Sequence, residues 1–91
     1  MSRSPSLPHP RQDLMSRPLE EELALFDVEA GEVHTLNASA AVVWMTLEGA
    51  REREELVEAL METFELDRED AEEGVEEALE SFRQAGLLEG S

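Results

Sequence analysis

The chain has 91 residues, 41% of them hydrophobic, which suffices for one small domain with a modest core. Its 23 Asp and Glu residues outweigh 7 basic residues, all arginine, and the net charge is −16. Such a surface repels nucleic acids and anionic membranes, which bind basic side chains, and the lack of cysteine excludes disulfides and thiolate zinc sites.

Residues 1–12 contain three of the four prolines together with several Ser and Arg, a composition typical of disorder. We therefore expect a disordered arm over residues 1–12 and a single domain over residues 13–91. The arm lacks the hydrophobic stretch of a signal peptide, and the longest apolar run, residues 38–47, is too short to span a bilayer. We expect a cytoplasmic protein that does not bind membranes.

The first half of the domain predicts three antiparallel strands. A weak strand pattern covers residues 13–18, and alternating hydrophobic residues predict a better strand over residues 21–28. Gly31 follows within VEAGE, where glycine can supply the positive φ of a hairpin turn. Residues 32–36, EVHTL, then return antiparallel to the second strand.

Three helices follow the strands. Asn37 can cap a first helix that ends at Gly49, and a second helix covers about residues 52–64. Asp67 caps a third helix, which Gly86 closes. The order of the elements predicts an α+β fold in which a three-stranded antiparallel sheet is followed by three helices.

The third helix carries two kinds of apolar surface. Val75, Leu79 and Phe82 form a stripe of large side chains. Beside it lies what we call the small-residue stripe: Ala71, Gly74, Ala78, Ser81 and Ala85. Small residues let another backbone approach closely, and two interpretations remain open. The small-residue stripe packs against another part of the same domain, or it lines a groove for an incoming peptide.

No pattern of catalytic residues is present. The sequence lacks a glycine-rich phosphate loop, a GxSxG motif and a thiol nucleophile, and His34 has no second histidine near it. Exposed glutamates on a helix stay ionised, whereas a catalytic carboxyl group needs its pKa raised by burial. We therefore expect no enzymatic activity, no cofactor and no metal site.

Several short motifs follow one another in a fixed order. A hairpin of the form D-x-x-x-G leads to Leu-Asn and then to a tryptophan, after which come an EL…L…F motif and a last helix ending in Gly-Leu. These positions are Asp27, Gly31, Leu36, Asn37, Trp44, Glu55, Leu56, Leu60, Phe64, Glu65, Leu66, Gly86 and Leu87. In the order and spacing of these motifs, over roughly residues 13–89, the chain resembles the PqqD family.

The resemblance implies a winged helix-turn-helix domain that acts as a peptide chaperone, a RiPP recognition element. Such a domain binds the leader region of a ribosomally synthesised precursor peptide, which adds as a strand beside the third strand and lies against the third helix. The chaperone presents the precursor to a modifying enzyme such as a radical-SAM protein or a leader peptidase. The resemblance places the peptide-binding residues on these two elements: Glu32, Val33, His34, Thr35, Ala71, Gly74, Val75, Ala78 and Phe82.

Two other functions compete with peptide binding. A winged helix-turn-helix is also a DNA-binding architecture, but the third helix would bring a row of acidic side chains into the major groove, which is electrostatically unfavourable. The alternative that remains is a non-catalytic acidic interaction module that uses the small-residue stripe for dimerisation.

Overall fold

The computed structural model describes residues 7–89. Three strands, β1 (Met15–Leu19), β2 (Glu22–Asp27) and β3 (Glu32–Leu36), precede three helices, α1 (Ala38–Leu47), α2 (Arg53–Phe64) and α3 (Arg68–Gln84). The strands form one antiparallel sheet in the order β1-β2-β3. The predicted α+β fold is confirmed, and α2 and α3, which pack together, form the helix-turn-helix.

The β2–β3 hairpin is shaped by Asp27 and Gly31. Gly31 has a φ of +70°, and its N–H donates to the carbonyl oxygen of Asp27 at 2.8 Å. Asp27 pairs with Glu32 in the strand register, so Gly31 and Glu32 both oppose one residue of β2. This arrangement is a G1 β-bulge, in which glycine takes the left-handed conformation at low cost. The sequence-based prediction for Gly31 is therefore confirmed.

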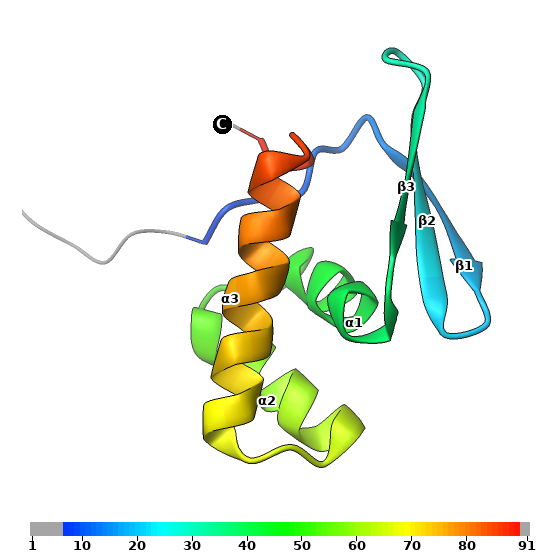
Figure 1. The fold of residues 1–91 in the computed structure, drawn as a ribbon. Helices are drawn as coiled ribbons and strands as arrows, with labels where there is room; N and C mark the ends of the chain where they lie inside the picture. The colour runs from blue at the N-terminus through cyan, green and yellow to red at the C-terminus, as the bar shows by residue number, and fades with distance from the viewer. Residues whose placement is uncertain (1–6, 90–91) are drawn as a thin grey trace, which may run out of the picture.

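Helix α1 forms a layer between the sheet and the other two helices (Figure 1). It contacts β2 and β3 on one side and α2 and α3 on the other. Within residues 7–89, neither α2 nor α3 makes a comparable contact with a strand. The helices therefore cover one face of the sheet, and among the described residues no helix lies on the opposite face.

Trp44 of α1 lies in the middle of the core. Its side chain is 2% exposed and meets Phe82 of α3 edge to face, with ring centroids 5.1 Å apart and ring planes at 87°. Leu25 and Leu36 from the sheet and Leu56 from α2 belong to the same buried cluster. The sheet and all three helices thus share one core.

The amino-terminal segment runs beside the carboxyl-terminal end of the domain. Pro10 forms an antiparallel bridge with Leu88, and the N–H of Arg11 donates to the carbonyl oxygen of Leu87 at 3.0 Å. The Arg11 guanidinium donates to the carbonyl oxygen of Gly86 at 2.9 Å and to the carboxylate of Asp27 at 3.1 Å. A single side chain thus joins the start of the domain, the β2–β3 turn and the end of α3.

This arrangement corrects the prediction of a disordered arm over residues 1–12. Residues 7–12 are ordered by their contacts with the β2–β3 turn and with the end of the chain. Residues 1–6 lie outside the described residues. Composition indicates a local bias toward disorder, but it does not reveal contacts with residues far away in the sequence. Gly86, which accepts a hydrogen bond from Arg11, is more than seventy residues away from it.

We predict that Trp44→Ala lowers the free energy of unfolding by about 3–5 kcal/mol, because it removes buried area and leaves a cavity beside Phe82. Met45→Ala is the matched control, since Met45 is the next residue of α1 and its side chain is 55% exposed. Urea unfolding of both variants measures the difference. A Trp44→Ala protein that is as stable as the Met45→Ala protein would contradict this placement of the core.

The carboxylate of Asp27 provides a pH-dependent prediction. Its pKa lies below the ordinary value because the carboxylate accepts a hydrogen bond from the N–H of Ala30, and the Arg11 guanidinium lowers it further, although burial opposes both. A carboxyl group whose pKa is lowered by folding stabilises the fold above the pKa of the unfolded chain, about 3.9, and this contribution is lost as the pH falls through the folded pKa.

We therefore expect Asp27→Asn to melt at a lower temperature than the wild type at neutral pH, and the gap to close as the pH falls below about 4. Thermal melts across this range measure the gap. Glu29→Gln, an exposed change in the same hairpin, serves as the control. A gap that stays constant with pH would show that the charge of Asp27 has no part in the stability.

Candidate functional site

The outer edge of β3 is unpaired within residues 7–89. The sheet order places β2 in the middle and leaves β1 and β3 at the two edges. Of the five residues of β3, all but Leu36 are exposed or half-buried. The main-chain N–H and C=O groups of such an edge can pair with a strand from another chain.

The bulge at Gly31 determines which main-chain groups point outward. Along an antiparallel pair, residues that exchange hydrogen bonds with the partner strand alternate with residues whose N–H and C=O groups point away from it. In a hairpin closed by this bulge, Glu32 and then His34 are directed toward β2. We infer that the main-chain groups of Val33 and Thr35 face the free edge.

The side chains of β3 alternate between the two faces of the sheet. Leu36 is buried among the helices, so His34 lies on the helix side, whereas Val33 lies on the opposite face and is 58% exposed. The Nε2 atom of His34 is shielded from solvent and makes no hydrogen bond in the described structure, although it lies 3.4 Å from a carboxylate oxygen of Glu32. An incoming strand could supply the missing hydrogen-bond partner.

Four of the α3 residues predicted to bind a peptide lie in the core. Ala71, Val75 and Phe82 are fully buried, and Ala78 is 6% exposed. All four belong to the cluster that the sheet, α1 and α2 build together. The prediction that they line an open groove is therefore corrected, because the domain's own side chains already cover them.

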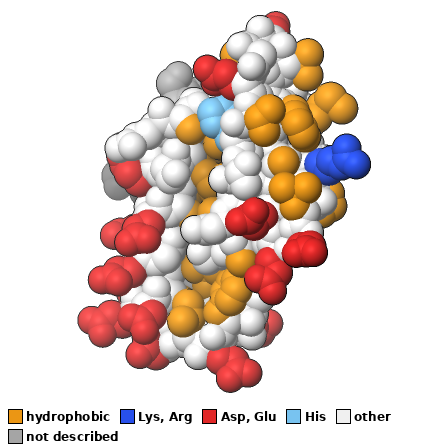
Figure 2. Space-filling model, turned by 45° about the vertical axis from the view of Figure 1, so that its right-hand side comes forward, with side chains coloured by type: hydrophobic (Ala, Val, Ile, Leu, Met, Phe, Trp, Pro, Cys, Tyr) orange, Lys and Arg blue, Asp and Glu red, His pale blue; other side chains and the backbone are white. Residues whose placement is uncertain are grey.

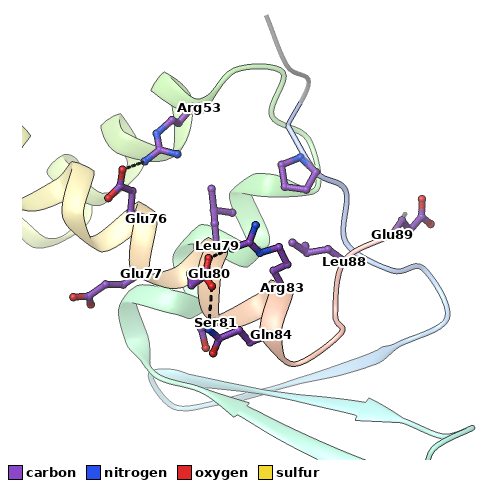
Figure 3. Close-up of a pocket in the computed structure, with 11 residues that line it drawn as sticks. Arg53, Glu76, Glu77, Leu79, Glu80, Ser81, Arg83, Gln84, Leu88 and Glu89 are labelled. Atoms are coloured by element: carbon purple, nitrogen blue, oxygen red, sulfur yellow. Dashed lines mark hydrogen bonds and ion pairs between the residues drawn. The ribbon is translucent and has the colours of Figure 1, made fainter. Parts of the chain in front are cut away.

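The small-residue stripe is divided between the core and the surface. A Cβ atom on Gly74 would lie 3.0 Å from the Cδ1 atom of Leu60, so this glycine allows α2 to pack closely against α3. Ser81 and Ala85, further along the stripe, are exposed. In Figure 3, Ser81 projects from the side of α3 that is nearer the strands, whereas Leu79 projects from the other side. Only the exposed end of the small-residue stripe, at Ser81 and Ala85, is therefore accessible to a ligand or a second subunit.

The solvent-facing surface of α3 is acidic. Its exposed carboxylates are those of Glu69, Asp70, Glu72, Glu73, Glu76, Glu77 and Glu80. Figure 2 shows a row of acidic side chains along one margin of the molecule and hydrophobic side chains between this row and the sheet. Among residues 7–89, no group of His, Asp and Glu is arranged to hold a metal ion, and no helix is long and apolar enough to cross a bilayer.

A shallow depression of about 930 Å³ lies over the exposed side of α3 (Figure 3). It is lined by α3, by the start of α2 and by the segments around Pro8 and Leu88. The ion pair between Arg53 and Glu76, at 3.5 Å, crosses it. None of its lining residues belongs to β3. The depression and the free strand edge are therefore separate features, and the strand edge is the one with unused main-chain groups.

Comparison with known proteins gives matches over most of the described chain. Residues 22–88 match the sequence model of coenzyme PQQ synthesis protein D (PqqD). The structure is similar to that of TbiB1 in complex with the TbiA(beta) leader peptide, with 25% sequence identity and a TM-score of 0.78, over 91% of this chain and 96% of that chain. It is also similar to a lasso peptide synthetase B1 complexed with the leader peptide, with 22% identity and a TM-score of 0.76, over 89% and 95% of the two chains. No curated protein sequence matches the chain.

The burial of Ala78 leads to a prediction about the small-residue stripe. Ala78→Met should lower the free energy of unfolding by about 1–3 kcal/mol, because a larger side chain overpacks the core. Ser81→Met, three residues on and exposed, should change stability by no more than about 0.5 kcal/mol. Chemical unfolding compares the two variants. Equal stability of both would mean that Ala78 lies at the surface of a groove.

Proposed function

The chain belongs to the PqqD family, and we propose that it is a RiPP recognition element, a non-catalytic chaperone that binds the leader of a ribosomally synthesised precursor peptide. The observation that carries this proposal is the unpaired edge of β3, where the main-chain groups of Val33 and Thr35 face outward. The similarity to TbiB1, which is in complex with a leader peptide, supports it.

We propose that the leader adds as a fourth strand beside β3. Each main-chain hydrogen bond contributes only about 0.5–1.5 kcal/mol net, so side-chain contacts must add to the affinity. On the helix side, leader side chains would lie near His34, whose Nε2 atom lacks a hydrogen-bond partner, and near the exposed Ser81. This combination gives affinity through the main chain and selectivity through a few side chains.

The bound leader leaves the rest of the precursor free for an enzyme. We propose that this enzyme is a modifying protein such as a radical-SAM protein or a leader peptidase, and that the chaperone itself needs no cofactor, because strand addition uses main-chain groups alone. Precursors of this kind are made on ribosomes, so we place the complex in the cytoplasm.

Substitutions at Thr35 test strand addition directly. Thr35→Pro removes the outward N–H, and an edge strand tolerates proline where its N–H does not pair within the sheet. We expect binding of a synthetic peptide with the leader sequence of the cognate precursor to weaken by at least about 0.5–1.5 kcal/mol, the contribution of one hydrogen bond. Thr35→Ala keeps the N–H and should bind like the wild type. Calorimetric titration measures both variants, and thermal melts check that both are folded.

Amide hydrogen exchange of the wild type provides the second measurement. In the free protein the amide of His34 should exchange slowly and those of Val33 and Thr35 quickly, and the peptide should slow the latter two. Equal binding by the Thr35→Pro and Thr35→Ala proteins, or a peptide that leaves the Val33 and Thr35 amides unprotected, would contradict the proposed function.

A further inference from the structure

The face of the sheet opposite the helices carries exposed hydrophobic side chains. Met15, Phe26 and Val33 are neighbours across the three strands in the sheet register, and Leu19 lies further along β1. Met15 is 62% exposed, Val33 58% and Leu19 40%, whereas Phe26 between them is half-buried. We call these four residues the outer patch. Figure 2 shows hydrophobic side chains gathered over the sheet beside a basic side chain.

Acidic residues lie at both ends of the outer patch. At one end, Glu20 and Glu21 form the turn between β1 and β2 and Glu22 begins β2, and at the other end Glu29 lies in the turn between β2 and β3; all four are exposed. A cation, Arg17, lies within the sheet face, in register with Ala24 and Thr35. The surface that complements this one has an apolar centre with basic groups on either side of it.

A second copy of this chain does not have that complementary surface. Each copy carries a net charge of −16, and two outer patches in contact would bring the glutamates of the turns together, which costs energy. The charge therefore favours a different protein as the occupant. An exposed apolar patch with a polar rim is typical of a protein–protein contact.

We propose that the outer patch is the docking surface for the enzyme that acts on the bound precursor, through apolar side chains flanked by basic residues. This inference rests on the proposed function. Strand β3 belongs to both surfaces, because a leader strand beside it places every second side chain on the outer face, next to Val33. The enzyme then contacts the outer patch and the leader together, and it binds the loaded chaperone more tightly than the empty one.

The test changes β1, which lies at the opposite edge of the sheet from the proposed leader strand. The double variant Met15→Gln and Leu19→Gln removes the exposed hydrophobic side chains of β1. Met45→Gln, an equally conservative change of an exposed side chain on α1, is the control. The probes are the synthetic leader peptide and the purified enzyme that modifies or cleaves the same precursor.

We expect the double variant to bind the leader as the wild type does and to bind the enzyme at least about tenfold more weakly, the loss typical of a central contact. Biolayer interferometry with and without leader measures enzyme binding, and mass spectrometry of the precursor follows its conversion. The leader should strengthen enzyme binding by the wild type, and the Met45→Gln protein should match the wild type throughout. Thermal melts establish that each variant is folded, and the single Met15→Gln change serves as a milder second variant.

Equal enzyme binding by the wild type and the double variant would overturn the proposal. A wild-type dimer on gel filtration that the double variant dissociates would also overturn it, because the outer patch would then bind a second copy. If the wild type binds no leader but its enzyme binding still depends on Met15 and Leu19, the docking surface stands and only the proposed function fails.

Discussion

The packing of α1 between the sheet and α3 is the constraint on which the other features depend. Trp44 meets Phe82 of α3, while the sheet contributes Leu25 and Leu36 to the same core. Within the described residues, α1 is the helix that contacts both the strands and the other helices. As a result α3 does not close over the edge of β3, and the strand keeps main-chain groups that are free to pair. The candidate site is thus an unpaired strand edge that α1 keeps apart from α3.

The negative charge of the domain adds an electrostatic contribution to the proposed peptide binding at this edge. Strand addition by itself discriminates little between sequences, since main-chain groups are common to all peptides. The acidic side chains of α3 and of the turns give the domain a negative surface, so under the proposed function they would favour leaders with basic residues and slow the approach of acidic ones. Such selection weakens as the salt concentration rises, because exposed charges are screened beyond about 8–10 Å at physiological ionic strength.

Local patterns in the sequence predict the strands and helices, but they do not predict the contacts between residues that lie far apart in the chain. Asn37 and Asp67 accept hydrogen bonds from the N–H groups of Ala40 and Asp70, as predicted for the capping residues of α1 and α3. The start of α2 lacks such a residue, and Glu55 caps it instead by accepting from the N–H groups of Arg51 and Glu52.

The candidate site could be predicted only in part, for a similar reason. The third strand can be predicted from its own residue pattern. Which side of α3 is buried cannot be predicted in this way, because it depends on how α2 packs against α3. A small residue such as Gly74 fits a groove and a close helix contact equally well in the sequence, and the position of Leu60 decides between them. The pairing of Arg11 with Asp27 and Gly86 likewise joins residues whose proximity no local pattern records.

The pairing of the two ends of the domain has a topological consequence. Residues 9–11 and 87–89 run side by side, with hydrogen bonds from Arg11 to Leu87 and from Glu89 to His9. The polypeptide therefore enters and leaves the domain at one place (Figure 1), as in domains that tolerate insertion into a loop of a larger protein. This domain could be inserted into a loop of a host enzyme, and the two loop residues on either side of the insertion would stay close together in space. Equally, a short linker could join the two ends and new termini could be opened in an exposed turn such as residues 20–21, giving a circular permutant with the same core.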